Sequence, residues 1–297
     1  MKKLFIVLGM IAGAAVGFGA ALLIINLINL ANTTDEDSTE SIEFIEATVV
    51  NEHEINLSDY DTNIALTEAG EYLLTGEFSH LIKIDIPTDK DAEEKPQVVL
   101  KLNNVNIDSE TTAIKNPYFS DLFLITLPNT TNTIISTSDT VIDTVGHIAI
   151  DGEGVLTVWN QQTSGRGVAV SANNMGIYGG ENIFIGGATA TGAGISTTDR
   201  YWIDGGDVTI LGTDMLEAPV DNDANRPDTK PRSASFSLQQ IYPAGSVIRV
   251  LNSKGVKVAT YTAPANFRTV IVSNDFITSG EYTLYIDNDE VKTTEVK

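Results

Sequence analysis

Cysteine is absent from this chain of 297 residues, and histidine occurs only three times. The first absence excludes disulfides and thiolate chemistry, so packing alone must hold the fold together. His53, His80 and His147 are scattered, and neither a serine nor a metal-ligand pattern accompanies them. A histidine-based catalytic or metal centre is therefore not indicated.

Basic residues are also few: 18 Lys and Arg stand against 40 Asp and Glu, which gives a formal net charge of −22. Binding to nucleic acid requires a basic surface that neutralises phosphates. The charge balance therefore argues against nucleic acid as a partner and makes cations the more natural ligands.

Long helical periods are missing after residue 31, and an internal repeat takes their place. Each copy consists of a short strand, a Gly or Asn turn and a second short strand. Units this small cannot bury an apolar face alone and must stack on their neighbours. We therefore predict a right-handed parallel β-helix of about six or more rungs, with a helix-rich fold as the weaker alternative. The clearest copies begin at Ile150, Ile177 and Ile203, which lie 27 and 26 residues apart, and weaker ones begin at Leu74, Leu102 and Leu127.

Four aromatic residues near the repeat corners are candidates for carbohydrate binding. If the isoleucines that begin the three clear copies point inward, the strand alternation places these aromatic rings outward. Flat rings on a flat sheet suit the apolar faces of sugar rings. The alternative is that loops or the C-terminal part of the chain cover the rings. The four candidates are Trp159, Tyr178, Phe184 and Trp202.

Acidic residues at the same corners are candidate metal ligands. Equivalent positions on stacked rungs bring carboxylates close together, and a cation would relieve their repulsion. Tyr178 interrupts the column formed by the first and third of these residues. The four candidates are Asp151, Glu153, Asp204 and Asp207.

A second candidate metal site lies in a Pro-rich segment near residues 218–232. Asp221 and Asp223 alternate with Asn residues, a spacing of oxygen ligands that suits calcium. Arg226 and Arg232 occupy the places where an EF-hand loop needs Gly and Glu, so the segment is not an EF-hand. A solvated loop explains the same residues, because Asp and Asn also favour turns.

The N-terminus predicts where the protein works. Lys2 and Lys3 precede an uninterrupted apolar run of 22 residues from Leu4 to Ile25. As a helix this run would be about 33 Å long, enough to cross a bilayer. A cleaved signal peptide, the alternative, has a shorter apolar region. We therefore expect an uncleaved signal anchor, with the rest of the chain on the extracellular side.

Three small residues, Gly9, Gly13 and Gly17, repeat at four-residue spacing within this run. They would lie on one helix face, where a second transmembrane helix could approach closely. Self-association is one interpretation, and a glycine-rich anchor without a partner is the other.

Four regions follow from these patterns. Residues 1–31 form the anchor and residues 32–47 an acidic stalk that cannot bury enough apolar surface to fold alone. Residues 48–230 form the β-helix. Residues 231–297 form a small antiparallel β unit that caps the last rung, because an uncapped solenoid end is an open strand edge.

Several segments resemble a known family. Gly70–Gly76 and Val98–Ile107 are similar to the opening of the bacterial cellulose- and pectin-binding β-helix family, whose members are described as carbohydrate-binding domain-containing proteins. The repeats and the closing strands, such as Ser279–Tyr285, match as well. The resemblance implies a calcium-bearing β-helix that binds plant-type polysaccharides, acidic ones especially, without established catalysis. The chain departs from the family at Arg166 and Ala193, where members usually carry an acidic residue.

The sequence thus predicts a membrane-anchored, extracellular protein that binds a polysaccharide, pectic or cellulosic, with calcium as a cofactor and without catalysis. The alternative is a structural adhesin or envelope protein that uses the solenoid as a spacer to reach a protein partner. A polysaccharide lyase is less favoured, because its base would have to be Arg166 or Arg200, and arginine is almost permanently charged. Fold alone does not establish an enzyme.

Overall fold

The computed structural model describes residues 52–214, 219 and 232–297, and within these ranges the chain forms 21 strands and one short 3-10 helix, η1 (Leu57–Asp59). The strands are β1 (Glu52–Asn56), β2 (Ile64–Leu66), β3 (Gly70–Phe78), β4 (Ile82–Ile84), β5 (Gln97–Ser109), β6 (Ile114–Asn116), β7 (Asp121–Thr126), β8 (Thr131–Ser136), β9 (Thr140–Thr144), β10 (His147–Gly152), β11 (Val155–Asn160), β12 (Val168–Ile177), β13 (Glu181–Ile185), β14 (Ala193–Ile203), β15 (Asp207–Gly212), β16 (Arg232–Tyr242), β17 (Val247–Asn252), β18 (Lys257–Thr262), β19 (Phe267–Asn274), β20 (Gly280–Ile286) and β21 (Asp289–Val296).

The predicted anchor (residues 1–31), with Gly9, Gly13 and Gly17, and the predicted stalk (residues 32–47) lie outside the described residues. Across the ranges that the structure covers, we find no helix with the length and apolar character needed to span a bilayer.

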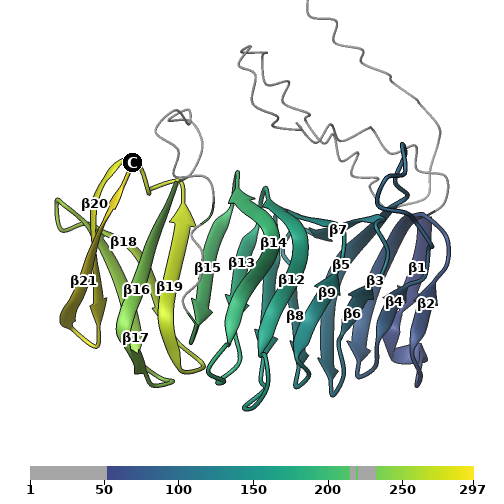
Figure 1. Ribbon diagram of the computed structural model, residues 1–297, viewed down its shortest axis with the longest axis horizontal. Helices are drawn as coiled ribbons and strands as arrows, with labels where there is room; N and C mark the ends of the chain where they lie inside the picture. The colour runs from purple at the N-terminus through teal and green to yellow at the C-terminus, as the bar shows by residue number, and fades with distance from the viewer. Residues whose placement is uncertain (1–51, 215–218, 220–231) are drawn as a thin grey trace, which may run out of the picture. The chain divides into compact units, whose positions relative to one another are not determined.

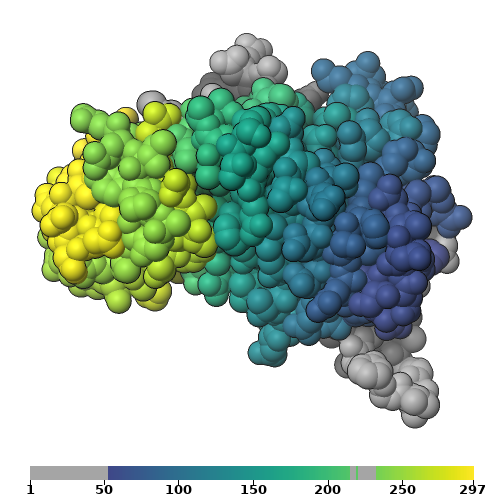
Figure 2. Space-filling view, turned by 90° about the horizontal axis from the view of Figure 1, so that it is seen from below, coloured from purple at the N-terminus to yellow at the C-terminus, as the bar shows by residue number. Residues whose placement is uncertain are grey.

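Parallel strands from successive turns pair in three stacks (Figure 1). The first stack contains β1, β3, β5, β7, β10 and the second halves of β12 and β14. The second contains the ends of β3 and β5, then β8, β11, β13 and β15. The third contains β2, β4, β6, β9 and the first halves of β12 and β14. Figure 2 shows the same order on the surface, where blue, teal, green and yellow residues succeed one another.

This arrangement confirms an all-β solenoid, which makes about five turns rather than the six or more predicted. The difference arises at the C-terminal end of the solenoid. The last predicted copy, which begins at Ile203, continues into β15, but no parallel third-stack strand follows β15 among the described residues, where β16 pairs antiparallel with β19. The right-handed winding of the helix stays a prediction.

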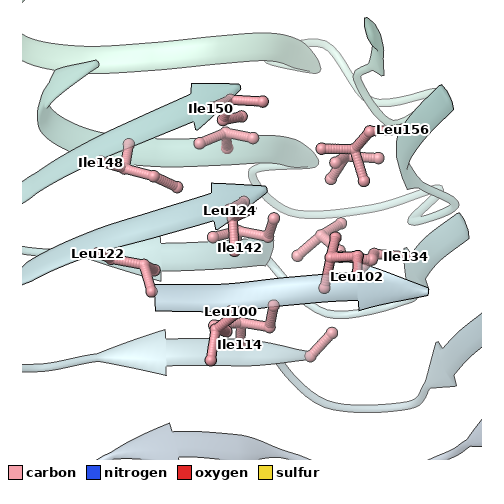
Figure 3. Close-up of a cluster of buried hydrophobic side chains, with 14 of the residues drawn as sticks. Leu100, Leu102, Ile114, Leu122, Leu124, Ile134, Ile142, Ile148, Ile150 and Leu156 are labelled. Atoms are coloured by element: carbon pink, nitrogen blue, oxygen red, sulfur yellow. The ribbon is translucent and has the colours of Figure 1, made fainter. Parts of the chain in front are cut away.

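Inward side chains form apolar ladders through the solenoid (Figure 3). One ladder runs in register from β5 to β14, and every member is 0% exposed: Leu100, Leu124, Ile150, Ile177 and Ile203. Adjacent strands lie about 4.8 Å apart, so each side chain packs against the equivalent one above and below it. The predicted inward direction of the three isoleucines is confirmed.

The predicted direction of Phe184 is wrong. Four residues, 151–154, separate Ile150 from Val155, whereas three, 178–180, separate Ile177 from Glu181, the partner of Val155. The shorter turn shifts β13 by one residue, which exchanges the two faces of the strand. Phe184 therefore pairs with Val158, points into the core and is 0% exposed.

Antiparallel strands close the C-terminal end of the solenoid. β19 pairs antiparallel with β15, the last parallel strand, and β16 pairs with β19. β17, β18, β20 and β21 form a separate four-stranded antiparallel sheet. A second core, which includes Leu211, Phe236 and Phe267, joins these strands to the last rung. The predicted C-terminal antiparallel unit is confirmed, and the predicted boundary at 230/231 falls in a segment outside the described residues.

Candidate functional site

The four aromatic candidates occupy three different places. Tyr178 and Trp202 lie on the outward face of the first stack and are partly exposed. Trp159 lies on the outward face of the second stack, between Ile135 and Ile185 of the neighbouring rungs. Phe184 lies in the core. The structure therefore brings only Tyr178 and Trp202 together.

A third ring, His147, completes an aromatic cluster on the first stack. The rings of His147 and Trp202 are nearly parallel, at 13°, with their centroids 5.7 Å apart. The Tyr178 ring meets Trp202 edge to face, at 80° and 6.5 Å. The indole Nε1 of Trp202 donates a hydrogen bond of 3.2 Å to the Tyr178 hydroxyl. We call these three residues the aromatic cluster.

Small residues beneath the cluster explain how rings from three rungs meet. Ala149, Gly176 and Trp202 are in register on the outward face of β10, β12 and β14. A Cβ at Gly176 would lie 2.7 Å from Cε2 of Tyr178 and 2.9 Å from Cε2 of Trp202. Both rings therefore lie directly over the glycine, in space that any side chain would fill.

The cluster is uncharged at neutral pH. His147 is only 6% exposed, and this burial, together with the nearby charge of Lys95, lowers the pKa of its imidazole to about 4. Burial also raises the pKa of the Tyr178 hydroxyl, and the carboxylates of Asp204 and Asp151 raise it further against the opposing effect of the Trp202 hydrogen bond. The rings thus present a neutral, partly apolar surface.

Two carboxylates flank the tyrosine. The Tyr178 amide donates to the Ile150 carbonyl at 2.8 Å and the Asp204 amide to the Ile177 carbonyl at 2.7 Å. Asp151, Tyr178 and Asp204 therefore follow one another on successive rungs, with the tyrosine interrupting the acidic column. Oδ1 of Asp151 accepts a 2.7 Å hydrogen bond from the Gly152 amide, and burial raises the pKa of this carboxyl.

A family model described as carbohydrate-binding domain-containing protein matches residues 58–229. The chain belongs to this family. The matched segment is more than half of the chain and contains the whole aromatic cluster. No curated protein and no solved structure matches the chain.

Among the acidic candidates, Glu153 and Asp207 do not occupy equivalent positions on their rungs. Asp207 is in register with Glu181 and, through it, with Val155, whereas Glu153 lies in the turn before Val155. Within residues 52–214 and 232–297, no three acidic or histidine side chains lie close enough together to hold a metal ion. Asp221 and Asp223 lie outside the described residues.

The two arginine candidates for a lyase reaction lie on different faces of this family member. Nη2 of Arg166 donates a 3.0 Å hydrogen bond to Oγ of Ser196, in the third stack. Arg200 lies in the first stack, in register with Asn174 and, through it, with His147. The two guanidinium groups are therefore not parts of one site.

The loop of residues 87–96, between β4 and β5, lines a cavity of about 620 Å³. Half of its lining residues are charged, namely Asp89, Lys90, Asp91 and Glu94, and none is aromatic. This cavity lacks the stacking surface that a carbohydrate-binding protein needs, so the aromatic cluster is the stronger candidate site.

The sequence pointed to two of the three rings and missed His147. The alternating side-chain directions along β10 could have located His147, because His147, Ala149 and Asp151 share the outward face of that strand. Taken alone, an isolated histidine carried no information about a ring two rungs away.

Proposed function

We propose that this protein binds a polysaccharide at the aromatic cluster without reacting with it. The observation that carries the proposal is the contact of Trp202 with His147 and Tyr178 on an outward face, in a chain of the carbohydrate-binding family. The C–H groups of one face of a sugar ring stack on such rings, and each ring contributes on the order of 1 kcal/mol. The flanking carboxylates of Asp151 and Asp204 are acceptors for sugar hydroxyls.

Calcium bridging between an acidic polysaccharide and the protein is the alternative form of this proposal. It rests on the family resemblance and on Asp221 and Asp223, whereas the contacts of the aromatic cluster support stacking. The two forms differ in their response to a chelator, because stacking involves no metal.

We expect the full-length protein to bind at least one polysaccharide of a broad glycan array and to be pulled down by it in the presence of EDTA. If binding is lost with EDTA and returns with calcium, the protein holds the polysaccharide by calcium bridging and not by stacking on the aromatic rings. Absence of binding to every glycan, with and without calcium, would favour the adhesin that uses the solenoid as a spacer. Incubation with the bound polysaccharide should release neither reducing ends nor unsaturated products.

We propose that the polysaccharide lies outside the cell and that residues 4–25 tether the protein there. The apolar run and the preceding Lys2 and Lys3 support this topology. Protease added to intact cells should remove the solenoid and leave a membrane-bound stub. Recovery of the intact protein from the cytosol would contradict the proposal.

A further inference from the structure

The Asp151 carboxylate, beside the aromatic cluster, is held in a fixed position. Oδ1 of Asp151 accepts the Gly152 amide hydrogen bond at 2.7 Å, and a Cβ at Gly179 would lie 2.5 Å from this same oxygen. Among the described residues no hydrogen bond reaches Oδ2 of Asp151, and the side chain is partly exposed. A ligand on the cluster therefore meets a carboxylate oxygen that its own hydroxyl groups can reach.

Among residues 52–214 and 232–297, no lysine or arginine forms an ion pair with Asp151. Lys101 belongs to the same outward row as Asp151, but Ile125 separates them and Lys101 forms an ion pair with Glu71. The carboxylates of Asp204 and Asp151 both act electrostatically on the Tyr178 hydroxyl and raise its pKa.

Two basic residues of the described chain, Lys95 and Arg200, lie at the other edge of the cluster. Lys95 acts on the pKa of His147, and it also acts on Asp121, whose pKa burial raises to about 6. Arg200 is in register with Asn174, the neighbour of His147. The cluster thus has a carboxylate edge along Tyr178 and a mixed edge along His147.

A sugar ring on Trp202 and Tyr178 would therefore lie next to Asp151. A neutral sugar can donate a hydroxyl hydrogen bond to that carboxylate, and such charge-assisted bonds are stronger than neutral ones. A uronate would place a second negative charge a few ångströms away, where like charges repel and both lose hydration.

We infer that the aromatic cluster selects neutral glycans over their uronate counterparts, and that Asp151 sets this selectivity. The inference rests on the proposed function, because it applies only if the cluster binds a sugar chain. It also reverses the preference for acidic polysaccharides that the family resemblance implies.

The test compares matched oligosaccharides that differ only in the C6 carboxylate: a glucan with a glucuronan and a galactan with a galacturonan. Dissociation constants for the full-length protein are measured by calorimetry in EDTA. We expect the neutral member of the bound pair to bind about tenfold more tightly at low salt. The difference should shrink as added salt screens the repulsion.

Asp151→Asn is the decisive variant, because the asparagine Oδ1 can still accept the Gly152 hydrogen bond while the charge is lost. It should reduce the preference for the neutral oligosaccharide over the uronate by about tenfold, mainly by strengthening binding of the uronate. Asp108→Asn is the matched control, since Asp108 is exposed on the outward face of the second stack, and it should leave the preference unchanged.

Equal or tighter binding of the uronate by the unmodified protein would overturn the inference and leave the proposed function intact. So would an unchanged preference in Asp151→Asn. Loss of uronate binding in Arg200→Gln would assign the selectivity to the other edge of the cluster and overturn the inference as well. If no oligosaccharide and no array glycan binds, both the inference and the proposed function are contradicted.

Discussion

Replacement of Ile177 by aspartate should unfold the solenoid. Ile177 is 0% exposed and lies in register between Ile150 and Ile203 in an apolar ladder of fully buried side chains. A carboxylate there would have no partner, and burying it would cost about 4 kcal/mol or more. Urea denaturation followed by circular dichroism should show either a much lower urea concentration at the midpoint of unfolding or no folded baseline.

Tyr178→Ser is the matched control for this variant. Tyr178 is the next residue along the chain but lies outward and is partly exposed, so its loss should lower the free energy of unfolding by only about 1 kcal/mol. Equal losses in the two variants would show that the assigned directions of these neighbouring side chains are wrong.

Trp202→Ala should weaken polysaccharide binding by about 10- to 100-fold while leaving the fold intact. The substitution removes the ring that contacts both His147 and Tyr178, and its site on the outward face carries little of the core packing. Affinity electrophoresis on the polysaccharide identified by the array gives the change, and thermal denaturation checks the fold.

Trp159→Ala tests which face of the solenoid binds the polysaccharide. Trp159 is also a partly exposed tryptophan, but it belongs to the second stack. Its removal should leave the affinity unchanged if the aromatic cluster is the binding site. The opposite pattern, with binding lost in Trp159→Ala and kept in Trp202→Ala, would move the site to the second stack.

The repeat predicted the solenoid because each rung must bury its apolar side chains against the next. Ile150, Ile177 and Ile203 are therefore both the repeat in the sequence and the ladder in the core. Phe184 shows where such reasoning fails. A prediction from the repeat assumes turns of equal length, whereas the turn before β13 is one residue shorter, and this places Phe184 in the core instead of on the surface.

The site was harder to predict than the core because its contacts skip a rung. Trp202 reaches His147 across β12, and what permits the contact is the missing side chain of Gly176. The difference in turn length also places Glu153 in the turn before Val155, whereas Asp207 is in register with Val155. Sequence periodicity finds residues that repeat, whereas this cluster is built from residues that differ on every rung.

The reversed strand at the end of the stack also determines how this protein can assemble. A bare parallel rung could template an identical rung from another molecule, and repetition of that step would build a fibre. Here β19 runs against β15 and takes up its outer edge. A second copy therefore finds no parallel template on β15, and growth by addition of rungs to this strand is blocked.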